Sequence, residues 1–320
     1  MQAFVAILLT RKGARVILTL HEITKRYGEM YALKDFNAEF TEGLYGILGP
    51  NGAGKTTLSN IIVGLISQSS GSLAYNGIGL SKILPDYLEK IGYLPQQPGY
   101  YRNYTAEEFL HYIAVIKGIS KREITSRIDE VLSTVNLQDV RKKKLRTYSG
   151  GMIRRLGIAQ AIINNPEILI LDEPTAGLDP IERIRFRNLI TQLAENRIVL
   201  LATHIVTDVE AISKEVILLN KGVKVAQASA LELMGKIEGC IWETQAAGES
   251  DINSLSQKYD IGNITKRDDH YLLRIVSEEK PTESSIPQSP TLEDVYLKYF
   301  GRESLLPSSD MRFVKRFRIR

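Results

Sequence analysis

Cysteine is nearly absent from this chain, and several other features that mark particular classes of protein are missing as well. The single Cys240 excludes an internal disulfide, which suits a reducing compartment, and a small packed side chain is its ordinary role. The four histidines stand far apart, so no His/Cys grouping has the spacing of a metal site. No apolar run approaches the about 18 residues that cross a bilayer. The sequence therefore predicts a soluble chain without disulfides or a zinc-type site.

A strong charge of one sign is also missing. The 41 basic and 37 acidic residues leave a net charge of +4, which is too balanced to indicate a nucleic-acid partner. The apolar run 4–9 has no basic residues before it and no small-residue cleavage site after it, so it does not fit a secretory signal. We expect residues 1–15 to be an extension that precedes the fold.

A glycine-rich stretch fits the phosphate-loop pattern GxxxxGK[ST]. It consists of Gly49, Pro50, Asn51, Gly52, Ala53, Gly54, Lys55, Thr56 and Thr57. We expect the three glycines to let the backbone curl so that its N–H groups face the β- and γ-phosphates, which a Cβ would obstruct. Lys55 would add a positive charge, and Thr56 would offer its hydroxyl to Mg²⁺.

The context of this stretch separates a phosphate loop from a chance match in a glycine-rich turn. Residues Leu44–Leu48 form a short apolar run typical of a buried strand, and Thr56–Leu65 have the pattern of an apolar-rich helix. A helix that starts here directs the positive end of its dipole at the phosphates. The context therefore favours nucleotide binding over a structural turn.

An apolar run that closes in two acidic residues predicts the other half of the site. The run Ile168–Leu171 fits a central parallel strand, and Asp172 falls at its carboxyl end, where open α/β sheets place their ligands. Asp172 is suited to the Mg²⁺ shell. Glu173 is suited to polarise the water that attacks the γ-phosphate, as a general base; the alternative is a solvated loop carboxylate.

Further motifs identify a family. The run Tyr148–Met152 precedes a long helical pattern, and with Gln96, Asp179 and His204 it resembles the ATPase subunit of an ATP-binding cassette (ABC) transporter. The resemblance extends over Leu18–Lys221 and contains the defining motifs in the family's order. It implies an α/β P-loop NTPase fold with a mixed or parallel sheet core, an antiparallel β-subdomain and a helical subdomain that carries the signature motif.

The resemblance assigns roles to residues outside the phosphate loop. Tyr27 matches the aromatic residue that stacks on adenine, although a lone tyrosine more often packs in a core. Gln96, followed by a second glutamine, matches the residue whose amide touches the Mg²⁺ shell and senses the membrane partner. His204 matches the switch histidine that contacts the γ-phosphate.

The signature motif implies a second copy of the chain. Three residues match its phosphate-contacting part: Ser149, Gly150 and Gly151. Ser149 has the character of a helix N-cap, and in the family this helix end caps the γ-phosphate held by the partner of a head-to-tail dimer. Asp179 resembles the loop that crosses that dimer. Tyr148 and Met152 replace the Leu and Gln of the commonest signature, a variant that resembles the bacterial type-two exporter subfamily.

The pattern along the chain predicts several units. Their boundaries are an extension 1–15, a nucleotide-binding domain 16–225 with a helical subdomain at about 97–150, a C-terminal α+β appendage 226–300 and a basic tail 301–320. Strands are expected at Val16–Glu22 and Leu33–Phe40. Helices are expected at Glu107–Lys117, opened by a capping box, and at Ile124–Val135.

The appendage is expected to contain strands Gly239–Glu243 and Tyr271–Val276, a helix Asp251–Tyr259 and a Pro/Ser-rich linker Pro281–Pro290. The segment Thr291–Tyr296 resembles the closing helix of type-two exporter ATPases. The basic and aromatic residues 312–320 either touch anionic lipid or form a disordered end. Three tyrosines after Gln96 either pack or form a docking face: Tyr100, Tyr101 and Tyr104.

These inferences predict an ATP- and Mg²⁺-dependent ATPase that powers a separate membrane permease, as a homodimer on the cytoplasmic face of the cell membrane. The favoured direction is export. One alternative is an ABC ATPase that acts on nucleic acid or ribosomes, although relatives of that kind carry two cassettes or a long coiled-coil insertion. An importer subunit is the other alternative.

Overall fold

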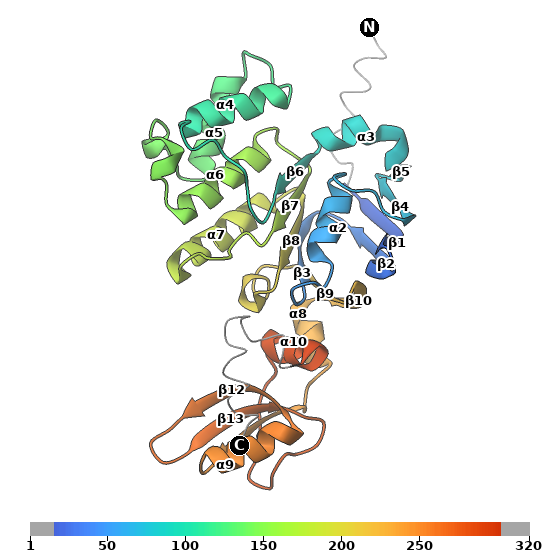
Figure 1. The fold of residues 1–320 in the computed structure, drawn as a ribbon, viewed down its shortest axis with the longest axis vertical. Coiled ribbons are helices and arrows are strands. Elements are labelled where there is room, and N and C mark those ends of the chain that lie inside the picture. Colours follow the sequence, from blue (N-terminus) through green and yellow to red (C-terminus); the bar gives the residue numbers. More distant parts are fainter. Residues whose placement is uncertain (1–15, 302–320) are drawn as a thin grey trace.

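The computed structural model describes residues 16–301, which build three sheets with helices around them (Figure 1). The central sheet has the strand order β10-β9-β3-β8-β7-β6, in which β9 and β10 are antiparallel and the other neighbours are parallel. Its strands are β3 Gly43–Leu48, β6 Ile91–Leu94, β7 Ile168–Asp172, β8 Ile198–Thr203, β9 Glu215–Asn220 and β10 Val223–Ala228.

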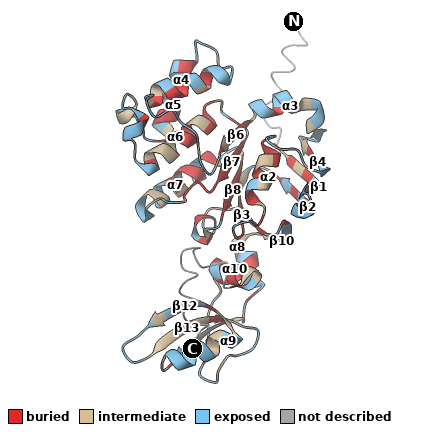
Figure 2. Ribbon diagram, in the orientation of Figure 1, coloured by how far each residue is buried: buried red, intermediate tan, exposed pale blue. Residues whose placement is uncertain are grey.

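Strand β7 shows why this sheet is buried on both faces (Figure 2). Side chains alternate across a strand, and Leu169 and Leu171 enter one hydrophobic core while Ile168 and Ile170 enter the other. All four are fully buried. The predicted central strand at 168–171 is confirmed.

An antiparallel sheet covers one face of the central sheet. It has the order β2-β1-β4-β5 and shares a core with helix α2. The elements on this side are β1 Leu18–Tyr27, β2 Met30–Phe40, α2 Lys55–Ile62, β4 Ser70–Tyr75, β5 Ile78–Gly79 and α3 Leu80–Glu89. The two predicted strands are present but longer than expected, because β1 continues to a tight turn at Gly28, whose φ of +60° suits glycine.

Helices cover the other face (Figure 1). They are α4 Ala106–Ile116, α5 Ile124–Thr134, α6 Gly150–Ile162 and α7 Pro180–Leu193, with short 3₁₀ turns η1 Gln138–Val140, η2 Leu145–Thr147 and η3 Val206–Asp208. The predicted capping box at the start of α4 is confirmed: Thr105 accepts from the N–H of Glu108, and the Glu108 carboxylate accepts from the N–H of Thr105.

A third, antiparallel sheet lies beyond the central one, with the order β12-β13-β11-β14. The C-terminal elements are α8 Ala230–Gly235, β11 Ile241–Ala246, α9 Glu249–Lys258, β12 Asp260–Lys266, β13 Tyr271–Val276, β14 Ile286–Pro287 and α10 Leu292–Phe300. The predicted linker Pro281–Pro290 is wrong in part, because Ile286 and Pro287 pair with β11 as an edge strand. We call residues 241–287 the C-terminal unit.

Two features connect this region to the central sheet. Strand β10 runs to Ala228, across the expected boundary at residue 225, and α10 folds back so that Leu292, Val295 and Tyr296 join the core of the central sheet. Within residues 16–301, no helix is both long and apolar enough to span a membrane. The basic tail and the N-terminal extension lie outside the described residues.

Candidate functional site

Four segments that the sequence singles out meet at one edge of the central sheet. Strands β3, β8, β7 and β6 are parallel neighbours, so their carboxyl ends lie side by side. The segments that follow these ends are the phosphate loop, His204, Glu173 and Gln96. This edge is where α/β sheets of this kind bind their ligands.

The glycines of the phosphate loop allow its tight curl, and two of them also allow a close approach to neighbouring backbone. A Cβ on Gly49 would lie 2.2 Å from the carbonyl oxygen of Leu219, and one on Gly54 would lie 2.5 Å from that of Ala32. Gly52 has open space around it but a φ of +81°. Two glycines therefore allow close backbone packing, and the third provides a turn conformation that favours glycine.

Lys55 opens helix α2 and is almost completely buried. Its ammonium donates to the carbonyl oxygens of Gly49 at 2.8 Å and Pro50 at 3.2 Å, and it lies 3.5 Å from Oε1 of Glu173. The loop thus curls around this charge, which reaches the acidic end of β7.

Asp172 is fully buried, and within the part of the chain that the structure describes neither carboxylate oxygen accepts a hydrogen bond. Burial raises its pKa, while Thr56 and Lys55 lie close enough to act in the opposite direction. A buried carboxylate with two free oxygens beside a threonine hydroxyl is a donor set that suits Mg²⁺. Asp172 and Thr56 therefore fit the predicted metal.

Glu173 is 4% exposed, and its backbone φ of +48° is unusual for a residue with a side chain. Its Oε2 lies 2.8 Å from Nδ1 of His204 and accepts from Thr203 at 3.4 Å. Burial opposes the charged form, but the contacts with His204 and Lys55 outweigh it and lower the pKa of Glu173. The carboxylate is therefore deprotonated at neutral pH, as a general base must be before it acts, and it is not a solvated loop residue.

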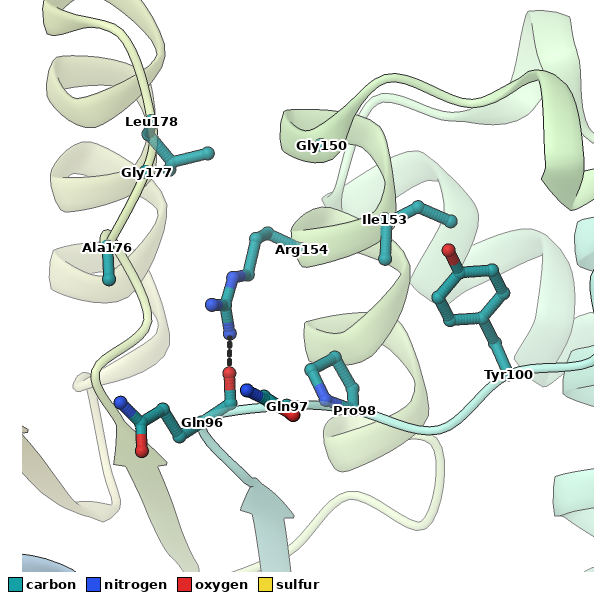
Figure 3. Close-up of a pocket in the computed structure, with 10 residues that line it drawn as sticks. All are labelled: Gln96, Gln97, Pro98, Tyr100, Gly150, Ile153, Arg154, Ala176, Gly177 and Leu178. Atoms are coloured by element: carbon teal, nitrogen blue, oxygen red, sulfur yellow. Dashed lines mark hydrogen bonds between the residues drawn. The ribbon is translucent and has the colours of Figure 1, made fainter.

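Gln96 lies beside a cavity of about 330 Å³ that separates it from the start of α6 and from residues 176–178 (Figure 3). Nη1 of Arg154 donates to the backbone carbonyl of Gln96 at 2.7 Å. The Gln96 side chain points away from Arg154. Arg154 therefore ties the glutamine's backbone to the signature helix.

The other predicted residues lie apart from the phosphate loop within one chain. Ser149 caps α6, accepting from the N–H of Met152 at 3.2 Å, and Asp179 caps α7, accepting from Glu182 at 2.9 Å. Helices α6 and α2 belong to the cores on opposite faces of the central sheet. Tyr27 ends β1 with 49% of its surface exposed, so it is not a core tyrosine.

Sequence reasoning missed three contributors. Thr203 bonds the Glu173 carboxylate, Arg154 holds Gln96, and buried Asp208 accepts a short hydrogen bond from Thr175. Asp208 lies four residues after His204 in the sequence, and this short separation from a predicted site residue is a signal that could have indicated its contribution. No feature of the sequence indicates that Glu173 has a positive φ.

A phosphate loop at the end of β3, a buried acidic pair at the end of β7 and a helix that begins at the loop define a P-loop nucleoside triphosphatase. Comparison with known proteins narrows this class. Residues 33–176 match the family described as ABC transporter.

The chain is 36% identical over 298 residues to the uncharacterized ABC transporter ATP-binding protein YdbJ of Bacillus subtilis, which covers 89% of this chain and 96% of that relative. It is 31% identical to the Nod factor export ATP-binding protein I of Cupriavidus pinatubonensis, over 90% of this chain and 91% of the relative. A solved dimer of the ATP-binding cassette MJ0796 with ADP and Pi superposes with a TM-score of 0.60 at 29% identity, over 66% of this chain and 98% of that one.

This chain belongs to the ATP-binding proteins of ABC transporters, and it is an ATPase of that family. The predicted resemblance and the α/β P-loop fold class are confirmed.

Proposed function

We propose that the chain is the ATP-hydrolysing subunit of an ABC exporter, and that it drives a separate permease by closing on two ATP molecules as a homodimer. The observation that carries this proposal is the position of the Glu173 carboxylate, 2.8 Å from His204 and 3.5 Å from Lys55, beside Asp172, whose carboxylate has no hydrogen-bond partner among residues 16–301. Export is supported by the Nod factor relative and by the Tyr148–Met152 variant.

Each residue of the site has a role in this proposal. Lys55 and the backbone N–H groups of the phosphate loop bind the phosphates, and Tyr27 stacks on the adenine. Asp172, Thr56 and Gln96 would hold Mg²⁺, which when bound neutralises charge on the β- and γ-phosphates. Glu173 accepts the proton of the attacking water, while His204 orients the carboxylate.

The dimer part of the proposal explains the residues that lie apart from the loop. The first N–H groups of an α-helix such as α6 have no acceptor within the helix and form a positive dipole end, yet α6 and α2 lie on opposite faces of the central sheet. In a head-to-tail dimer, Ser149, Gly150 and Gly151 would reach the γ-phosphate of the partner, and Asp179 would lie at the crossing.

We place the permease contact on exposed aromatic residues of the helical part. The ring of Tyr101 packs at a tilt against Tyr104 and edge-on against Tyr112, with ring centroids 5.0 and 5.6 Å apart. Tyr100, Tyr101, Phe109 and Tyr112 line a cavity of about 410 Å³ just after Gln96. Such a hollow suits an apolar segment from a membrane partner, which would hold the chain at the cytoplasmic face of the membrane.

Two variants test the site. Lys55→Ala should lose ATP binding, because it removes a charge that faces the phosphates. Glu173→Gln should bind ATP with parental affinity, hydrolyse it at least about 100-fold more slowly and accumulate a dimer, which gel filtration with ATP would detect. Equal turnover by Glu173→Gln and the parent would remove Glu173 from the general-base role.

The same Glu173→Gln variant tests the partner. Trapped with ATP and captured from native membranes, it should bring down a polytopic permease that mass spectrometry identifies. Lys55→Ala is the matched control and should capture less. Recovery of ribosomal or DNA-bound proteins in place of a permease would favour the nucleic-acid alternative, and recovery of a permease with a substrate-binding protein would favour import.

A further inference from the structure

The turn that follows His204 is tied to the loop that follows Glu173. Asp208 belongs to this turn, η3, and its fully buried carboxylate accepts a short hydrogen bond from the hydroxyl of Thr175, two residues after Glu173. The two loops are thus joined twice, through the contact between His204 and Glu173 and through Asp208. Movement of η3 would therefore move His204 relative to the carboxylate that it contacts.

Helix α10 is seated on this same turn. The N–H of Leu292 donates to Oε1 of Glu210 at 3.2 Å, just beyond η3. Leu292, Val295 and Tyr296 are at most 1% exposed and share a core cluster with Val206 of η3. Because α10 packs directly against η3, which begins two residues after His204, the helix lies close to the hydrolytic site. Burial, with a smaller contribution from the Glu173 carboxylate, raises the pKa of Tyr296 to about 12.

The C-terminal unit holds α10 in place through an ion pair. Arg274 of β13 bonds both carboxylate oxygens of Asp294, with Nε–Oδ1 at 2.9 Å and Nη2–Oδ2 at 2.6 Å. Asp294 is 3% exposed and also accepts from the N–H of Thr291, which caps α10. Although burial opposes its charge, the bonds from Arg274 and Thr291 lower the pKa of Asp294. Bidentate pairs of this kind define orientation as well as position.

We propose that α10 is a brace through which the C-terminal unit sets the position of His204, with Arg274, Asp294 and Glu210 as positioning residues for ATP hydrolysis. The inference rests on the proposed roles of Glu173 and His204. It gives the C-terminal unit a function in turnover, because β13 is bonded to α10, α10 packs on η3, and η3 begins two residues after the histidine. Nucleotide affinity depends on the phosphate loop, to which the brace makes no hydrogen bond or ion pair among residues 16–301.

The test measures kcat and ATP affinity separately in the full-length chain. Arg274→Met keeps the length of the side chain but removes the ion pair, and it should lower kcat about tenfold while the Kd for a fluorescent ATP analogue stays within about twofold. Lys258→Met is the matched control, since Lys258 is an exposed cation of the same C-terminal unit, at the end of α9, away from the Arg274–Asp294 pair. It should keep the parental kcat.

A second pair of variants decides the matter if Arg274→Met fails to fold. Glu210→Gln keeps an acceptor for the Leu292 N–H and should keep kcat, whereas Glu210→Ala removes it and should lower kcat. Parental kcat in both Arg274→Met and Glu210→Ala, or an equal loss of kcat and affinity, would overturn the brace. Glu173→Gln is assayed alongside to separate this proposal from the proposed function. If Glu173→Gln is inactive, either outcome above overturns the brace but leaves the proposed site standing. If Glu173→Gln is active, the proposed site is wrong, and the brace that depends on it is wrong as well.

Discussion

Single residues of the phosphate loop differ in what they contribute, although the motif treats its glycines alike. The backbone of Gly54 lies against Ala32, and its φ is +106°. Gly52 has a φ of +81°, and no atom of residues 16–301 lies within 4 Å of a Cβ added to it. A side chain at position 54 would therefore both strain the backbone and collide with Ala32, whereas a side chain at position 52 would only strain the backbone.

This difference predicts unequal costs for two substitutions of the same kind. Gly52→Ala should lower the free energy of unfolding by about 1 kcal/mol, because alanine resists a positive φ. Gly54→Ala should cost more than about 2 kcal/mol, because the Cβ also displaces the Ala32 backbone. Urea unfolding of both variants measures the difference, and equal costs would show that collision at Gly54 is relieved without loss.

Tyr296 makes both a stabilising and a destabilising contribution to the folded state. Its ring is buried in the core, but its hydroxyl is buried with no hydrogen-bond partner among the described residues. Tyr296→Phe should therefore raise the free energy of unfolding at pH 7 by up to about 1 kcal/mol.

The pH dependence of this variant follows from the pKa of about 12 in the folded state against about 10 when unfolded. As the pH rises above 10, the Tyr296 hydroxyl loses its proton in the unfolded parent but keeps it in the folded parent. The free energy of unfolding of the parent therefore falls between pH 10 and 12, and Tyr296→Phe, which has no hydroxyl, does not undergo this loss. Unfolding at pH 7, 10 and 11.5 measures this gap; a gap that stays constant or narrows would contradict the prediction.

At the level of helices and strands, regular patterns made much of the fold predictable. The apolar run before Asp172 and the capping box before α4 both correspond to the observed elements, because burial on two faces and cap chemistry act locally. Strand β14 could not be predicted, since a two-residue edge strand that includes Pro287 depends on its partner β11. Helix α3 was missed because Pro85 lies inside it, next to a kink at Ile83.

The candidate site divides in the same way. Asp172 ends strand β7, and Glu173 and Lys55 come after strands β7 and β3, whose carboxyl ends share an edge of the sheet. Their meeting was therefore predictable from the order of elements. The pairing of Asp208 with Thr175 joins residues 33 positions apart, and it depends on how two loops pack. Sequence spacing carries no signal for such packing.

The capping box of α4 supports a prediction at this scale. Thr105→Ala removes the acceptor for the Glu108 N–H, whose distance to Oγ1 is 3.1 Å, and should lower stability by about 1 kcal/mol. Thr105→Ser keeps an acceptor and is the matched control. Thermal unfolding by circular dichroism compares them, and an alanine variant as stable as the serine variant would show that the cap contributes nothing.

For the molecule as a whole, the two sides of the central sheet have large cores, but the C-terminal unit has a small one. Its own buried apolar residues are Ala246, Ile261, Leu273 and Ile275. A core of this size rarely supports independent folding. The stability of the unit therefore depends on α10, which belongs to the nucleotide-binding core.

This dependence should hold in both directions, so that deletion of residues 239–320 destabilises the nucleotide-binding part as well. The deletion removes Leu292, Val295 and Tyr296 from the main core, and each side chain of this kind contributes roughly 1.5–3 kcal/mol on burial. The sum approaches the whole stability of an ordinary domain, about 5–15 kcal/mol. We expect the deleted chain to be insoluble or to unfold at a much lower temperature. The control is Ile264→Ser in β12, where the Ile264 side chain is 46% exposed; its free energy of unfolding should stay within about 0.5 kcal/mol of the parent. A deletion variant with the parental melting temperature would show instead that α10 rests on a core that is complete without it.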